Sequence, residues 1–138
     1  MHENEVSSET IAAALEVHRH LGPGLVESVY EEALCHEFHL RTMPFRRQQG
    51  VPVLYKGVKL ATDLRLDLIV RDLVIVDNKA KEEILPIDRV KLLTYLRLTG
   101  KRLGLLINYH SALLRDGIVR VVNGLEADPL PAPGSFKL

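Results

Sequence analysis

Two consecutive runs rich in leucine, isoleucine and valine, at positions 64–70 and 73–79, constrain most strongly what this chain can fold into. Apolar runs of this length, bounded by polar residues, predict two β-strands. Because only a short link around Arg71-Asp72 separates them, the strands are expected to lie side by side and antiparallel. The remaining elements are expected to pack on the sheet that these strands begin.

The apolar spacing of α-helices appears in segments at about 7–20, 25–40 and 86–99. Ser7 or Ser8 would cap the first helix. Leu21-Gly22-Pro23-Gly24 ends it, because glycine frees the backbone and proline removes a hydrogen-bond donor. Pro86 and Gly100 suit the start and the end of the third helix.

Extended patterns predict further strands at 51–55, 58–60, 103–108 and 117–122. The Lys56-Gly57 pair between the first two is a two-residue hairpin signal. The order of helices and strands predicts an α/β fold (an α+β mixed sheet with helices packed on it), in a single domain over residues 1–123. The proline-rich C-terminal tail at 124–138 is expected to be irregular or frayed.

The composition limits the classes of function. With 18 basic and 18 acidic residues the chain carries no net charge, whereas a nucleic-acid-binding protein is often basic overall, although a local patch would suffice. The single cysteine, Cys35, excludes an internal disulfide framework and fits a reducing compartment. No apolar run approaches the roughly 20 residues that span a bilayer, and the acidic start lacks a signal-peptide core. A cytoplasmic protein without a membrane partner is expected.

Polar residues within the two central strands point to a functional site. Asp67 interrupts an apolar strand, and Asp77-Asn78-Lys79 places polar residues at the end of a Val/Ile run. A carboxylate in a half-buried strand is costly unless a cation or a hydrogen-bond network compensates it. Asp77 and Lys79 are two positions apart, so they face the same side of the sheet.

Whether Asp67 joins Asp77 depends on the register of the two strands. A three-residue link at 71–73, or a bulge, would pair Asp67 with Asp77 and place both side chains on one face. A two-residue turn at 71–72 would pair Asp67 with Val76 and turn its side chain to the opposite face. The sequence leaves both registers open.

If the carboxylates converge, they can support metal-dependent phosphodiester chemistry. Asp67, Asp77 and the backbone carbonyl of Asn78 suit a hard cation such as Mg²⁺ or Mn²⁺, which would lower the pKa of a bound water and neutralise charge on a phosphate. Lys79 would hold the attacking water or stabilise the transition state. Arg65, on the same strand face as Asp67, would orient that carboxylate or contact phosphate. The alternative is a structural ion pair between Asp67 and Lys79 at a sheet edge.

A second motif precedes these strands. Gly24-Leu25-Val26-Glu27-Ser28-Val29-Tyr30 matches a G-x-x-E-x-x-Y signature, and a D-x9-D-x-K pattern follows at 67–79. In both motifs the chain resembles the bacterial GxxExxY proteins, a branch of the PD-(D/E)XK nuclease superfamily. The resemblance extends over about residues 8–123, with further agreement at 21–24, 55–60, 92–96 and 105–108.

The resemblance implies a restriction-endonuclease-like core of helix, three strands, helix and strand, with an extra N-terminal helix. It also implies a metal-dependent nuclease acting on DNA or RNA. Glu27, Asp67 and Asp77 would bind Mg²⁺ or Mn²⁺, and Lys79 would assist the attacking water. Tyr30 would be a core aromatic residue with its hydroxyl near the site. Without the resemblance, Glu27 would be taken for a solvated helix charge.

Two departures from the family pattern bear on activity. Where the family has Val-Glu-Leu-Lys, this chain has Val76-Asp77-Asn78-Lys79, so one carboxylate is shorter and Asn78 needs a polar partner if it is buried. RecB-type nucleases carry Q-x-x-x-Y where this chain has Lys91 and Tyr95, which share a helix face. Lys91 would bind phosphate, or would pair with a carboxylate in the cation's place and leave an inactive relative.

Two alternatives to catalysis therefore remain open. One is an inactive nuclease-fold protein that binds nucleic acid or a protein partner. The other is an interaction module, such as a homodimer, whose acidic cluster is structural. A locally basic stretch would be either a solvated helix face or the path of a phosphate backbone; it comprises Arg89, Lys91, Arg97, Lys101 and Arg102.

Overall fold

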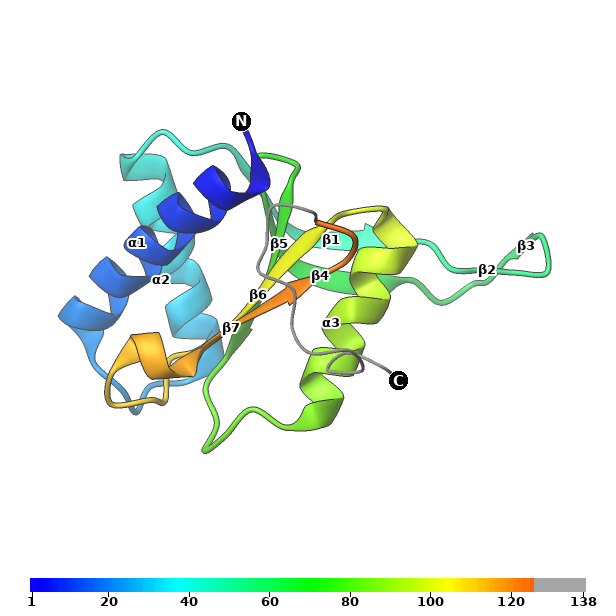
Figure 1. Ribbon diagram of the computed structural model, residues 1–138. Helices are drawn as coiled ribbons and strands as arrows, with labels where there is room; N and C mark the ends of the chain where they lie inside the picture. Colours follow the sequence, from blue (N-terminus) through cyan, green and yellow to red (C-terminus); the bar gives the residue numbers. More distant parts are fainter. Residues whose placement is uncertain (126–138) are drawn as a thin grey trace.

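A five-stranded sheet with helices on both faces forms the centre of the molecule (Figure 1). The structure is a computed structural model that describes residues 1–125. The helices of this part are α1 (Glu3–Leu21), α2 (Glu27–Leu40), α3 (Pro86–Thr99) and the short 3-10 helix η1 (Leu114–Gly117). The strands are β1 (Phe45–Val51), β2 (Leu54–Tyr55), β3 (Val58–Lys59), β4 (Leu64–Val70), β5 (Val74–Lys79), β6 (Leu103–Asn108) and β7 (Ile118–Val122).

The sheet is mixed, with the strand order β1-β4-β5-β6-β7. β5 and β6 are parallel, and the other neighbouring strands are antiparallel. The α3 helix connects β5 to β6 and so provides the crossover that a parallel pair requires. The predicted α/β class and the order of helix, three strands, helix and strand are therefore confirmed, with α1 as the extra N-terminal helix.

The two faces of the sheet pack against different helices (Figure 1). Val74 and Val76 of β5 belong to the core beneath α1 and α2, whereas Ile75 belongs to the core beneath α3. Because β5 and β6 are covered on both faces, they appear in the sequence as nearly continuous apolar runs. Gly104 of β6 permits a close approach of α3, since an added Cβ would lie 2.9 Å from side-chain carbons of Leu92.

The α1 helix begins earlier than the sequence pattern predicted. It starts at Glu3 rather than near residues 7–8, and Ser7 is buried within it. His2 and Glu5 form a capping box, in which the Glu5 carboxylate accepts a hydrogen bond from the His2 N–H at 3.2 Å. An ion pair from Arg102 to Glu3, at 2.8 Å, also fixes the first turn. This distant partner explains why the local pattern gave the wrong start.

Some apolar residues of the predicted helical segments at 7–20 and 25–40 are exposed to solvent. Among them are Leu15, Val26 and Val29, with 43%, 66% and 39% of their surface accessible. For Val26 the reason is the helix start, because α2 begins at Glu27 rather than at Leu25 and leaves Val26 as its N-cap. The other two lie at the margin of the apolar stripe, where periodicity alone does not fix burial.

Strand β1 was missed in the sequence, which was predicted to become extended only at Val51. The segment reads FRRQQGV and lacks the apolar run that marked its neighbours. As the edge strand of the sheet it pairs only with β4. Its charged side chains are held by tertiary ion pairs, Arg46 to Asp72 and Arg47 to Glu31 at 2.8 Å. A polar edge strand of this kind has no local signature that separates it from a loop.

The register of β4 and β5 settles the choice left open by the sequence. The paired residues are Leu68 with Val76, Ile69 with Ile75 and Val70 with Val74. The connection is thus the three-residue link at 71–73, and the same register brings Asp67 opposite Asp77. Both Arg71 (φ 50°) and Asp72 (φ 58°) adopt the left-handed conformation, which the tight reversal requires.

The remaining predictions concern single features. The hairpin turn at Lys56-Gly57 is confirmed, with positive φ of 49° and 81°. Cys35 is a buried free thiol, and burial raises its pKa to about 11. Among residues 1–125, no helix has the length and apolarity needed to cross a membrane. The predicted tail lies outside the described residues from position 126 onward, whereas Leu125 is buried against the core.

Candidate active site

Asp67 and Asp77 meet where the β4–β5 ladder ends. The last backbone pair is Leu68 with Val76, and beyond it the Asp67 carboxylate takes the place of a strand partner. Its Oδ2 accepts a hydrogen bond from the Asn78 N–H at 2.8 Å. The main-chain N–H and C=O of one strand residue point to the same side in an antiparallel pair. The Asn78 carbonyl is therefore directed toward Asp67 as well.

Burial makes this pair of carboxylates difficult to ionise together. Loss of hydration raises the pKa of Asp67 to about 7, and the charge of Asp77 adds to the effect, against the opposing hydrogen bond from the Asn78 N–H. Burial also raises the pKa of Asp77, while Lys79 and a hydrogen bond from Asp67 counteract the rise. The pair consequently carries negative charge that the surrounding protein only partly compensates.

Lys79 is the cation nearest to the pair. Its Nζ lies 3.3 Å from Asp77 Oδ1, and the two side chains are only 24% and 16% exposed. Burial has the largest single effect and lowers the pKa of Lys79, but the Asp77 charge, the hydrogen bond to Asp77 and the more distant carboxylates Glu27 and Asp88 together outweigh it and raise the pKa overall. Lys79 therefore remains protonated at neutral pH and directs an ammonium group into the site.

The pair and Lys79 share a small depression of about 150 Å³ on the α3 side of the sheet. Its lining comprises Arg65, Leu66, Asp67, Ile75, Val76, Asp77, Lys79, Lys91 and Tyr95. The structure thus brings together, in one depression, residues of β4, β5 and α3 that the sequence assigned to one site.

Lys91 does not take the place that a metal ion would occupy beside the carboxylates. Its side chain is exposed, and within residues 1–125 it forms no ion pair with a carboxylate, although it lines the depression. Two other members of the predicted basic stretch are engaged elsewhere: Lys101 pairs with Asp72 at 3.2 Å and Arg102 pairs with Glu3. The exposed cations of α3 are therefore Arg89, Lys91 and Arg97.

Glu27 lies at the first position of α2, exposed to solvent but within electrostatic reach of the pair. Partial loss of hydration raises the pKa of its carboxyl, and the Asp67 charge adds to this rise while Lys79 opposes it. Residues 1–125 contain no set of three His, Cys, Asp or Glu side chains arranged to hold a metal ion. Glu27 as a third ligand therefore stays a prediction.

The G-x-x-E-x-x-Y motif has a structural explanation in the turn before α2. The Tyr30 hydroxyl donates a hydrogen bond to the Gly22 carbonyl and accepts one from the Leu25 N–H at 3.1 Å. Gly24, with φ 102°, takes a conformation that other residues rarely adopt. Tyr30 is a buried core residue, as predicted, and its hydroxyl stabilises the turn that precedes Glu27.

Tyr30→Phe is expected to lower the free energy of unfolding by about 1–2 kcal/mol, because the Leu25 N–H and the Gly22 carbonyl, in a partly buried turn, each lose their hydrogen-bond partner. The ring itself should remain stacked on Tyr109, whose centroid lies 4.5 Å away. Urea denaturation measures the change, with the exposed Tyr55→Phe as the matched control. Equal stability of the two variants would contradict the role given to the hydroxyl.

Glu31 was not predicted from the sequence. It is buried one turn after Glu27 and accepts hydrogen bonds from Arg47 at 2.8 Å and from Gln48 at 3.0 Å. Gln48 has a φ of 52°, and its carbonyl accepts a hydrogen bond from Arg65 Nη1 at 2.9 Å. Glu31 thereby connects α2 to the strand that orients Arg65, and its charge adds to the raised pKa of Asp67. The one available signal was its helical spacing from Glu27.

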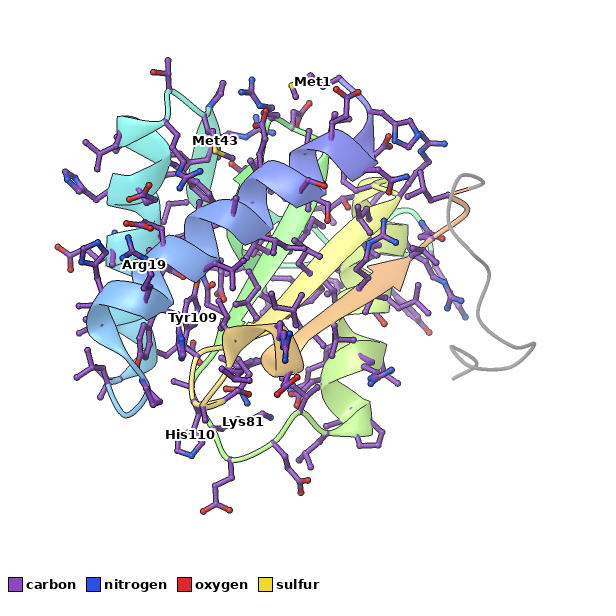
Figure 2. All side chains as sticks on the ribbon, turned by 60° about the vertical axis from the view of Figure 1, so that its left-hand side comes forward. Met1, Arg19, Met43, Lys81, Tyr109 and His110 are labelled. Atoms are coloured by element: carbon purple, nitrogen blue, oxygen red, sulfur yellow. The ribbon has the colours of Figure 1, made fainter. Side chains whose placement is uncertain are left out.

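Asn108 anchors the loop that follows the end of β5. Its side chain accepts a hydrogen bond from the Lys81 N–H at 3.1 Å and donates one to the Lys81 carbonyl at 2.8 Å. Lys81 and His110 consequently lie at the same end of the molecule (Figure 2). This contact holds the ends of β5 and β6 together and restrains the backbone just beyond Lys79.

Asn78 is unusual on the opposite face of β5. Its side chain is fully buried beneath α1 and α2, and neither Oδ1 nor Nδ2 has a hydrogen-bond partner among the described residues. The sequence comparison with the family pattern required a polar partner here, and the structure supplies none. The cost of an unsatisfied buried amide is about 1–3 kcal/mol.

Comparison with known proteins agrees with this geometry. No match was found among curated proteins or among solved structures. The model of the PD-(D/E)XK nuclease superfamily matches residues 4–121, most of the chain and all of the depression's lining. The match does not distinguish the GxxExxY branch, which stays a prediction. The carboxylate pair with its lysine and the extent of this match together show that the chain belongs to the PD-(D/E)XK nuclease superfamily.

Proposed function

We propose that the protein is a metal-dependent nuclease that hydrolyses phosphodiester bonds in DNA or RNA at Asp67, Asp77 and Lys79. The observation that carries the proposal is the convergence of two partly buried carboxylates, both with raised pKa, beside a protonated lysine in one depression. Nucleases of this superfamily generally use divalent metals. A merely structural ion pair would need one carboxylate, not two that repel each other.

The donor set fits Mg²⁺ or Mn²⁺. Magnesium in proteins is usually held by one or two carboxylates, with waters and substrate phosphates completing the shell. Asp67, Asp77 and the Asn78 carbonyl would supply the protein ligands, and Glu27 would add a further contact through water or after a small shift. When bound, the cation would neutralise charge that develops on the scissile phosphate.

The residues of the chain itself have separate roles in this proposal. Lys79 donates hydrogen bonds to the attacking water and to the phosphate oxygens, where negative charge increases in the transition state. Arg65 and Lys91, from opposite walls of the depression, bind the neighbouring phosphates. The Asn78 N–H keeps the Asp67 carboxylate in place. Tyr95 closes the α3 side of the depression and limits access of water.

The test is cleavage of labelled single- and double-stranded DNA and RNA by purified protein in Mn²⁺ and in Mg²⁺. Lys79→Ala is expected to lower the cleavage rate by about 10²–10³-fold, because it removes a donor to the transition state. Arg115→Ala, an exposed cation on η1 with 77% of its side chain accessible, is the matched control and should retain the rate.

Cleavage at the same rate by wild type and Lys79→Ala would identify a contaminating nuclease. Binding of nucleic acid without any cleavage, in either metal, would instead favour the inactive nuclease-fold protein. That second candidate is supported by the position of Glu27, which does not form a three-carboxylate group with Asp67 and Asp77 among the described residues.

A further inference from the structure

The β2–β3 hairpin, residues 52–61, projects from the body of the molecule and is called the arm below (Figure 1). It forms a two-stranded sheet of its own, separate from the five-stranded sheet. Leu54 pairs with Lys59 and Tyr55 with Val58, and the Leu60 N–H donates to the Val53 carbonyl at 2.9 Å. Two-stranded hairpins are marginally stable in water unless another surface supports them.

The apolar side chains of the arm have no covering surface among residues 1–125. Leu54, Tyr55 and Val58 are 68%, 61% and 62% exposed. Tyr55 and Val58 are directly paired, so they share one face of the ribbon. Isolated exposed apolar residues are ordinary on protein surfaces, but here they are gathered on a projection with no core behind it. The arm therefore offers an apolar surface suited to contact with a partner molecule.

The charge of the arm indicates an anionic partner. The arm contains Lys56 and Lys59 and no acidic residue, in a chain with 18 acidic and 18 basic residues. Lys56 Nζ lies over the Tyr55 ring, 5.5 Å from its centroid. A cationic tip beside a flat exposed aromatic matches the phosphates and bases of a nucleic acid better than it matches a second copy of this neutral chain.

The arm is joined directly to the candidate active site. Strand β1 leads into it, and β4, which carries Arg65 and Asp67, leads out of it. Asp67 lies nine positions after Val58, and nine extended residue steps can span at most about 30 Å. A polyanion with one phosphate at Asp67 and Asp77 would therefore reach the arm within about one turn of a double helix.

We propose that the arm enters the major groove of duplex DNA while the adjoining phosphodiester lies at the carboxylate pair. A major groove about 12 Å wide admits a two-stranded β-ribbon. The major groove of duplex RNA is too deep and narrow for side chains to enter. This inference rests on the proposed nuclease function and narrows its substrate class to duplex DNA.

The experiment is fluorescence anisotropy in EDTA with a duplex DNA of about two helical turns, a duplex RNA of the same sequence and the DNA single strand. The wild type is expected to bind duplex DNA most tightly. The double variant Lys56→Ala/Lys59→Ala is expected to weaken that binding about tenfold or more and to reduce the salt slope of log K by about 2. Tyr55→Ala should weaken binding with an unchanged slope.

Matched controls remove the same groups away from the arm: Arg115→Ala for charge and the 54%-exposed Leu113→Ala for apolar surface. Both should bind like the wild type. The arm variants should keep the wild-type melting temperature, because their side chains lie outside both cores. If Tyr55→Ala loses its fold, its loss of binding says nothing about the arm, and the double lysine variant then tests the inference.

Several outcomes overturn the inference. They are unchanged binding and salt slope in the arm variants, a preference of the wild type for duplex RNA or single strands, and a wild-type dimer that Tyr55→Ala converts to a monomer. The nuclease proposal is tested separately by cleavage in Mn²⁺. Cleavage with normal binding by the arm variants refutes the arm alone, whereas arm-dependent DNA binding without cleavage refutes the nuclease proposal alone.

Discussion

Asp77→Asn is expected to reduce the rate of phosphodiester cleavage by about a thousandfold or more, the largest effect of any substitution in the protein. Asparagine keeps the size of the side chain but removes the charge that would bind the divalent cation, and a bound cation would supply several kcal/mol of transition-state stabilisation. Single-turnover cleavage at saturating protein measures the chemical step apart from binding.

A second readout of the same variant is metal-dependent stability. If the wild type binds Mg²⁺ or Mn²⁺ at the pair, millimolar metal should raise its unfolding free energy by about 1–3 kcal/mol, since a ligand of the folded state stabilises it. Asp77→Asn should lose this increase, and Asp116→Asn, an exposed aspartate on η1, should keep it. Cleavage within tenfold of the wild type would show that Asp77 is not at the reacting centre.

Asp67→Asn is expected to stabilise the folded protein by about 1–3 kcal/mol at pH 8 in the absence of metal. Burial raises the pKa of Asp67 to about 7 from an ordinary value of 3.8, so the folded state binds a proton that the unfolded state releases. The folded state is therefore progressively destabilised as pH rises from about 4 to 7, and fully so above 7. Asparagine removes this penalty and still accepts the Asn78 hydrogen bond.

The expected gain in the free energy of unfolding is smaller than the whole pKa change of Asp67 would give, because solvent screens the buried charge and Asp77 shares the cost of burying it. Urea denaturation at pH 4 and pH 8 measures it: the two proteins should be nearly equal at pH 4 and should differ at pH 8. Asp116→Asn is again the exposed control. A less stable Asp67→Asn at pH 8 would indicate that the carboxylate contributes more through its hydrogen bond than it costs through its charge.

A stabilising substitution that also removes activity is typical of a functional site. Natural proteins retain a charge that their own residues leave uncompensated at positions where a bound ligand compensates that charge. The same logic applies to the unsatisfied Asn78 amide only in part, because its side chain faces the opposite side of β5 from the pair.

Much of the site was predictable because it lies on two adjacent strands. The shared face of Asp77 and Lys79 follows from strand geometry alone. The position of Asp67 required the length of the link, and the sequence offers no glycine there to favour one turn. Arg71 and Asp72 both adopt positive φ. Two ion pairs hold this link, one between Arg71 and Glu9 at 3.0 Å and one between Lys101 and Asp72 at 3.2 Å. These partners are distant in sequence, so no local pattern could reveal them.

The parts that could not be predicted depend on contacts between distant segments. Glu31 acquires its role from Arg47 and Gln48, which belong to a polar edge strand that resembled a loop. Glu27 could be associated with the pair only through family resemblance, since its motif has no metal-ligand spacing. The physical basis of that motif, the Tyr30 hydroxyl bound to the turn, becomes apparent only when the helix start is known.

The odd number of residues in the link at 71–73 has a consequence for how this protein can vary. Side chains alternate between the two faces of a strand, so the number of residues in the link decides which face each β4 side chain occupies. A substitution within the link leaves that number, and therefore the faces, unchanged. Removal of one residue would exchange the two sides throughout β4. Leu68 and Val70 would leave the core beneath α1 and α2, and Asp67 would enter it. Changes of length, rather than of residue type, are what this connection cannot tolerate.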